Sequence, residues 1–203
     1  MWQRPFFRTL LVWAALANLV TNAIFFVVLL RMVADGVPAA QIGLVSMAAG
    51  LGGILGAAVA PSLIHRMPTG RLTVLIGWMC CLPLVPLTVS SSVWTACAST
   101  FFLLLLNPVG NAGISSYRMA VTPDHLQGRV GSTSQFVSMS VMPLAPLLGG
   151  YLLEHQGGTA AITALVVASA LVAALLTSSR SIRSVPRPSE WVGAESAEPA
   201  LAA

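Results

Sequence analysis

The sequence predicts an all-α integral membrane protein of six transmembrane helices. Three observations support this prediction: the composition, the spacing of charged residues and the distribution of arginine. Of the 203 residues, 56% are hydrophobic and only 8% are charged, whereas soluble domains carry about 25% charged residues. The mean hydropathy is +0.84. A chain this apolar requires lipid as its solvent.

Charged residues divide the chain into apolar stretches. About 20 helical residues cross a bilayer core, so four of the five stretches fit one crossing each. The longest, 72–117, fits two, divided at the polar triplet 90–92. Barrel strands would alternate polar and apolar residues, and 101–106 are uniformly apolar. The uncharged stretches are 9–30, 36–64, 72–117, 130–153 and 156–179, and the predicted helices lie near 9–30, 41–64, 72–90, 93–117, 130–153 and 159–179.

Arginine predicts the orientation. The chain has no lysine, and only Arg31 falls in a predicted outer loop if the N-terminus is inside. Nine inner arginines against one outer arginine is a strong positive-inside bias. We therefore expect a multi-pass protein of the cell (plasma) membrane with both termini in the cytoplasm. The inner arginines are Arg4, Arg8, Arg66, Arg71, Arg118, Arg129, Arg180, Arg183 and Arg187.

The net charge of +4 reflects this topology. Because the arginines are divided among separate inner loops, no nucleic-acid partner is predicted. Residues 1–8 are expected to be a cytoplasmic segment, 9–179 the bundle, and 180–203 a disordered cytoplasmic tail rich in Ser, Pro and Ala. The alternative that the first helix is a cleaved signal peptide, with a site near 15–17, conflicts with an apolar stretch that continues to residue 30.

The first and fourth helices each carry an amide pair. Asn18 and Asn22 are four residues apart, as are Asn107 and Asn111, so each pair shares a helix face. The fifth helix carries Gln135 among serines. Amides are costly in hydrocarbon, which leaves two interpretations open: hydrogen bonds between helices, or the wall of a solvated substrate cavity.

Glycine on the second helix predicts close helix packing. Gly52 and Gly56 form a GxxxG pair, and Gly53 lies beside it. Glycine lets two helix backbones approach in lipid, where packing replaces the hydrophobic effect. This surface is either a static contact or one that slides during function. The third and sixth helices offer mainly Ser and Thr.

Titratable groups are missing from the middle of every predicted helix. An intramembrane hydrolase would need a nucleophile with a base, or a carboxylate pair, so no enzyme activity is predicted. Cys80, Cys81 and Cys97 lie in apolar helices without a CxxC pattern or a His partner, and are expected to be inert. No metal or other cofactor is predicted.

Two loops carry a resemblance to a known family. The stretch 56–71 contains His65-Arg66 followed by Gly70-Arg71, and it resembles the loop between the second and third helices of a half of a major facilitator superfamily transporter. The family pattern has an acid where His65 stands and a Gly near Pro68. This departure puts the inner charge network of the loop in doubt.

The second loop is the more specific one. Residues 117–130 include Arg118 and then Pro123-Asp124, Gly128 and Arg129. They resemble the region before the eleventh helix in the macrolide-efflux and enterobactin-exporter-like branch. The resemblance covers roughly residues 1–180 and implies the C-terminal six helices of a twelve-helix transporter, with the first and fourth helices here lining its cavity.

The resemblance implies transmembrane transport: half of an exporter of drugs or other small lipophilic compounds, expected to be incomplete alone because the substrate site lies between two halves. The expected partners are the lipid bilayer, a small lipophilic substrate, and a separate N-terminal half or a second copy. The chain would then be a split half, a truncated reading frame or a relic fragment. The alternative is a non-transporting membrane scaffold that binds a partner through its glycine-rich face.

Overall fold

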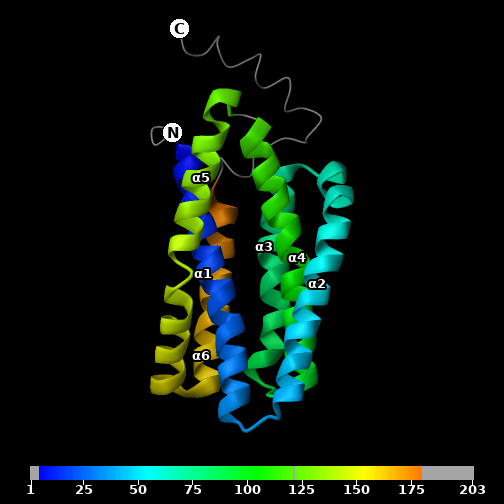
Figure 1. Ribbon diagram of the computed structural model, residues 1–203, viewed down its shortest axis with the longest axis vertical. Helices are drawn as coiled ribbons and strands as arrows, with labels where there is room; N and C mark the ends of the chain where they lie inside the picture. The colour runs from blue at the N-terminus through cyan, green and yellow to red at the C-terminus, as the bar shows by residue number, and fades with distance from the viewer. Residues whose placement is uncertain (1–4, 121, 180–203) are drawn as a thin grey trace.

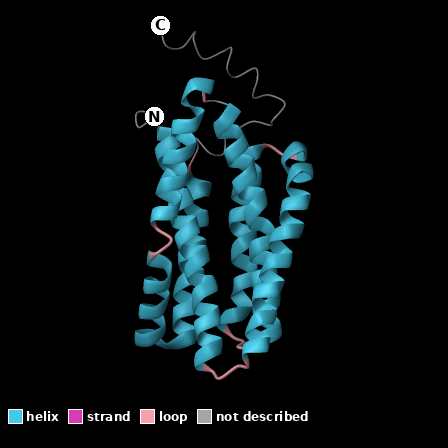
Figure 2. Cartoon of the chain, in the orientation of Figure 1, coloured by secondary structure: helices cyan, strands magenta, loops and turns pink. Residues whose placement is uncertain are grey.

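A computed structural model of the protein describes residues 5–120 and 122–179, all helix and connecting turns without a strand among them. The long helices run side by side along one axis (Figures 1 and 2). The predicted tail 180–203 lies outside the described residues. The elements are α1 (Pro5–Ala34), α2 (Ala39–Arg66), α3 (Thr69–Cys81), the 3₁₀ helix η1 (Leu82–Thr88), α4 (Val93–Ala120), α5 (Asp124–Ser140) and α6 (Leu144–Ser178).

The two ends of the bundle differ in charge. The start of α1 and the α2–α3 and α4–α5 loops lie at one end, which we call the arginine-rich end (top in Figure 1). The α1–α2 and η1–α4 turns lie at the other, which we call the Arg31 end. Proline sets three helix starts: Pro38, Pro68 and Pro123 each precede a helix in an extended conformation. Proline cannot continue a preceding helix, and its missing N–H costs nothing at a helix start.

The sequence predicted one α-helix over 72–90, and this prediction was wrong for the second half of the segment. The α-helix begins at Thr69 and ends at Cys81, and a 3₁₀ helix continues to Thr88. Pro83 and Pro86 explain the change, because each lacks the N–H that an α-helix needs at its position. Thr69–Thr88 together remain long and apolar enough to cross a membrane.

The fifth predicted helix, 130–153, is broken. α5 runs from Asp124 to Ser140, and α6 begins at Leu144 after a short turn. Pro143 and Pro146 cannot donate to carbonyls one turn earlier, which interrupts the ladder there. The helix also begins earlier than predicted, because Pro123 starts it while the uncharged stretch begins only after Arg129.

A reversal interrupts α6. Gly157 has φ +77° and ψ 166°, a backbone conformation that only glycine adopts readily. In Figure 1 the chain descends to the Arg31 end before this point and ascends after it. By length and composition, the described residues contain five candidate membrane spans, and the last, Asp124–Ser178, has 55 residues. The predicted count of six separate helices is therefore not confirmed.

Glycine brings two pairs of helices together. A Cβ on Gly52 or Gly56 would collide with the carbonyl oxygens of Phe101 and Leu105, so α2 and α4 touch backbone to backbone. A Cβ on Gly149 would lie 2.9 Å from Val27 Cγ2 and 3.5 Å from the carbonyl oxygen of Ala23, so α6 also packs closely on α1, though less closely than α2 packs on α4. Gly53 meets nothing within 4 Å and lies outside the α2–α4 contact.

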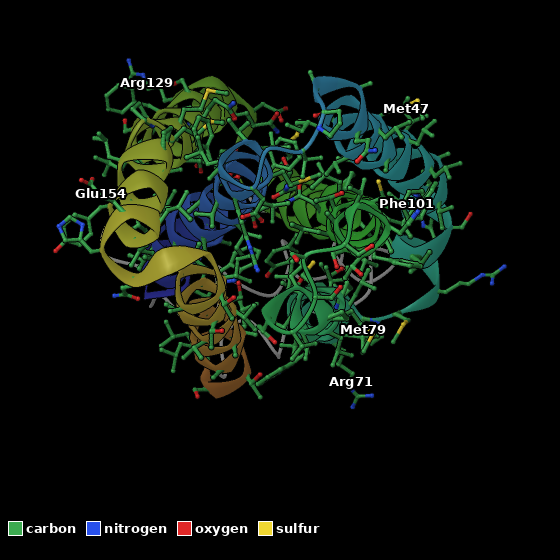
Figure 3. The ribbon with its side chains drawn as sticks, turned by 90° about the horizontal axis from the view of Figure 1, so that it is seen from below. Met47, Arg71, Met79, Phe101, Arg129 and Glu154 are labelled. Atoms are coloured by element: carbon green, nitrogen blue, oxygen red, sulfur yellow. The ribbon has the colours of Figure 1, made fainter. Side chains whose placement is uncertain are left out.

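Helix α3 joins these two pairs. A Cβ on Gly77 would lie 3.1 Å from Leu176 Cδ1 on α6, and one on Gly110 of α4 would lie 3.4 Å from Ile76 Cγ2. Figure 3, seen from the Arg31 end, shows Met47 of α2 and Arg129 of α5 on well-separated parts of the rim. The bundle is thus an α2/α4 pair and an α1/α6 pair bridged by α3.

The buried core is unequal along the bundle axis. Toward the Arg31 end one cluster joins α1, α2, η1, α4 and α6, with Ile24, Val45, Leu84, Leu103 and Ile162 among its members. Toward the arginine-rich end the buried cluster comes from α2, α3 and α4 alone: Ala60, Ile64, Leu72, Ile76 and Val109. Helices α1 and α6 are therefore joined to the other helices most firmly at the Arg31 end.

Candidate substrate pocket

A pocket with a volume of about 80 Å³ lies between the two helix pairs. Four helical elements form its walls: α1, α3 with η1, α4 and the last part of α6. Asn18 of α1 meets Asn107 and Asn111 of α4 along this pocket. The structure thus brings together three of the five amide residues that the sequence singled out. That they bind a substrate remains a prediction.

The amides keep unused hydrogen-bonding atoms. Asn18 Nδ2 donates to the carbonyl oxygen of Ala14 at 2.9 Å, and Asn111 Nδ2 donates to Asn107 Oδ1 at 2.8 Å. Among the described residues, Asn18 Oδ1, Asn111 Oδ1 and Asn107 Nδ2 have no partner shown. An amide nitrogen has two N–H donors, so this trio offers two free acceptor oxygens and one free amide nitrogen to whatever enters.

Asn22 and Gln135 do not join the pocket. Asn22 Nδ2 donates to the backbone oxygen of Asn18 at 2.7 Å, and Asn22 does not belong to the pocket lining. Gln135 is exposed on α5, and α5 packs mainly against α1. The shared cavity predicted for both amide pairs is therefore formed without Asn22.

Sequence reasoning missed the contributions of α3 and α6. Thr73 and Ser169 line the pocket, and each hydroxyl donates within its own helix, to Thr69 O at 2.8 Å and Leu165 O at 3.0 Å. Trp13 and Thr21 extend the α1 wall. A hydroxyl in an otherwise apolar helix was the available signal, but such residues are too common in membranes to stand out.

The pocket carries no formal charge. No Asp, Glu, His, Lys or Arg belongs to its lining, and within residues 5–120 and 122–179 no cluster of His, Cys, Asp and Glu could hold a metal ion. Cys80 and Cys81 line it as free thiols, and Cys97 is also free. The arrangement can bind by hydrogen bonds and apolar contact, but it offers no acid, base or nucleophile pair.

The loop residues lie away from the pocket, at the arginine-rich end. His65 and Arg66 are exposed at the end of α2, Gly70 is buried in α3 and Arg71 is exposed; Figure 3 shows Arg71 pointing outward. None of them lines the pocket.

The second loop is held by a glutamine. Gln127 Nε2 lies 2.9 Å from Asp124 Oδ1, 3.3 Å from Thr122 O and 3.4 Å from Met119 O, so it ties α5 to the end of α4. Gly128 and Arg129 are exposed. The side chain of Arg118 lies outside the part that the structure describes.

Arg31 fastens the opposite end. Its guanidinium donates to the carbonyl oxygen of Leu87 at 3.5 Å and to Thr159 Oγ1 at 3.3 Å, and lies 3.7 Å from the Asp35 carboxylate. Gly158 leaves it room, since a Cβ there would lie 2.7 Å from Arg31 Cδ. One side chain therefore links α1, η1 and α6, which accounts for the exception to the arginine bias.

Comparison with known proteins identifies the fold. No protein-family profile matches the sequence, and no curated protein matches it. Among solved structures, a D-xylose-proton symporter matches with a TM-score of 0.62 and 14% sequence identity, over 97% of this chain and 52% of the symporter. The chain therefore shares its fold with part of this symporter, and it spans about half of the symporter's length.

Proposed function

We propose that this chain is one half of a major-facilitator-type exporter. The observation that carries the proposal is the match of nearly the whole chain to about half of a transporter. Such transporters place the substrate between two six-helix bundles that rock against each other. The second bundle would be a separate chain, a second copy, or another segment of a longer chain.

The six-crossing topology belongs to this proposal. The 55-residue stretch Asp124–Ser178 is long enough for two crossings of about 20 residues each, and Gly157 supplies the reversal between them. With the arginine-rich end in the cytoplasm, both ends of the chain lie inside. The Pro123-Asp124 and Gly128-Arg129 motif favours the C-terminal half of the macrolide-efflux and enterobactin-exporter-like branch.

The proposed substrate is a small lipophilic compound. Trp13, Ile76 and Leu103 give the pocket an apolar wall beside its amides. A drug-sized ligand occupies about 300–1,000 Å³, far more than the 80 Å³ found here. The pocket would therefore hold only part of such a compound, and the rest would lie between this bundle and a second one. The match at 14% identity carries neither the sugar nor the proton of the symporter to this chain.

The test compares inside-out membrane vesicles from the host organism with those from a strain that lacks the gene. We expect energised accumulation of a lipophilic dye to fall in the deletion strain and to return with the wild-type gene. An Asn107→Leu variant should restore less than about a tenth of the rate, because the free amide nitrogen of Asn107 and the hydrogen-bond partner of Asn111 are both lost. Thr163→Val, an exposed site outside the pocket, should restore it fully. Equal accumulation with and without the gene would favour the non-transporting scaffold.

A further inference from the structure

The pocket is partly open, and its lining comes from helices of this one bundle. Its walls come from α1, α3 with η1, α4 and α6 of one chain, so no second bundle is needed to form it. This separates it from a substrate site built between two bundles. A ligand of suitable size could therefore be held by the isolated chain.

The pocket lies nearer the arginine-rich end. On α1 its lining runs from Trp13 to Thr21, and on α4 it includes Asn107 and Asn111. Beyond it toward the Arg31 end, the large buried cluster fills the space between the helices, and Arg31 joins three elements across that end. Toward the arginine-rich end, the buried cluster leaves out α1 and α6, and Asn111 is exposed. Access is therefore from the arginine-rich end.

The chemistry of the lining selects against charge. Two free acceptor oxygens, on Asn18 and Asn111, and the free amide nitrogen of Asn107 belong to a lining that is otherwise mainly apolar and carries no charged side chain. An ion would lose its hydration there without an opposite charge to replace it, whereas a neutral hydroxyl or amide would exchange water for these groups.

We propose that this pocket is a binding site for a small uncharged solute that carries hydroxyl or amide groups. A volume of about 80 Å³ fits a molecule of a few non-hydrogen atoms, or the polar end of a longer one. The inference rests on the proposed function for its role in transport, but binding itself requires only this chain.

The fluorescence of Trp13, which lines the pocket, reports whether a solute enters it. A protein that keeps Trp13 and carries Phe at the other tryptophans is placed in lipid nanodiscs, and its fluorescence is quenched with acrylamide, iodide or caesium ions. Acrylamide is a small neutral amide, so we expect its quenching constant to exceed those of both ions by about tenfold. The matched control keeps only Trp78, which is exposed on α3 and donates to Thr177 Oγ1 at 3.0 Å outside the pocket. If acrylamide quenches Trp78 as strongly as Trp13, access through lipid explains the result and the proposal is wrong.

Saturable binding is tested with matched competitors. Propionamide, propionate and propylammonium are similar in size and differ in charge. We expect propionamide alone to protect Trp13 from acrylamide, with saturation, and Asn18→Leu to weaken that protection about tenfold. If Asn18→Leu folds poorly, Asn111→Leu serves as the second variant, since Asn111 is exposed at the mouth of the pocket. Thr163→Val is the control, and propionamide should still protect Trp13 in it. Equal protection by the ions, or protection that never saturates, would overturn the proposal.

The experiments can contradict the exporter proposal and the binding-pocket proposal independently of each other. One outcome is that gene deletion abolishes vesicle transport while the purified chain does not bind propionamide. This result would support the exporter half and would contradict this pocket as its binding site. The opposite outcome is saturable propionamide binding with unchanged vesicle transport. This result would support the binding pocket and would contradict the proposed exporter function.

Discussion

At the scale of single residues, the contact between α2 and α4 depends on the absence of a Cβ. We expect Gly56→Ala to lower the free energy of unfolding by about 1–3 kcal/mol, because a new methyl group would overlap the Leu105 carbonyl and push the helices apart. Gly50→Ala is the matched control, since a Cβ there meets nothing within 4 Å, and it should be neutral or raise stability by up to about 1 kcal/mol. Unfolding by denaturing detergent, followed by circular dichroism, measures both. Similar losses in both variants would contradict a backbone contact at Gly56.

Also at the residue scale, the spacing of residues along one helix predicts only part of the pocket lining. A spacing of four places Asn18 and Asn22 on one face of α1, but only Asn18 lines the pocket. Spacing along one helix could not predict that Asn107 and Asn111 would come opposite Asn18. That depends on how α3 holds the two helix pairs apart, which involves contacts distant in sequence.

At the scale of elements, the number of crossings depends on Gly157. We expect alkaline phosphatase fused after Ser90 or after Gln156 to be active, and green fluorescent protein fused after Ser179 to fluoresce. This pattern follows from reversal at Gly157 with the arginine-rich end inside. Phosphatase activity at all three sites, or at Ser179 alone, would contradict the six-crossing topology.

The elements themselves were largely predictable, and the exceptions have one cause. Charge spacing placed the long helices because lipid excludes charge, so apolar length maps directly onto crossings. It could not distinguish α-helix from 3₁₀ helix at Leu82–Thr88, or locate the break before Leu144. Both are effects of proline on the backbone ladder. In membranes such prolines are often tolerated within a continuous helix, so their presence alone did not predict a break.

At the scale of the whole molecule, the bundle is firmly joined at one end and less so at the other. The large core cluster and Arg31 hold all the helix groups together at the Arg31 end, whereas the buried cluster at the arginine-rich end unites α2, α3 and α4 alone. A bundle built this way can move against a partner as one body while its pocket stays accessible from one side. Under the proposed function, a second bundle would supply the other half of what alternating access requires.

We therefore expect the purified 203-residue chain to catalyse no uphill transport by itself. Coupling to protons needs a titratable group inside the membrane, and in the described part of the chain the acidic, basic and histidine side chains lie at helix ends and turns, such as Asp35, Glu154 and His155. A parallel pair of copies is allowed geometrically, because the halves of such transporters are related by an axis along the membrane normal, but it would still lack the proton-carrying group. At most it would equilibrate a substrate. The assay is the purified protein in liposomes under an imposed pH gradient, with a panel of lipophilic drugs and empty liposomes as the control. Gradient-driven accumulation of any drug would show that this bundle is sufficient, and would move the search for the coupling group to its cysteines.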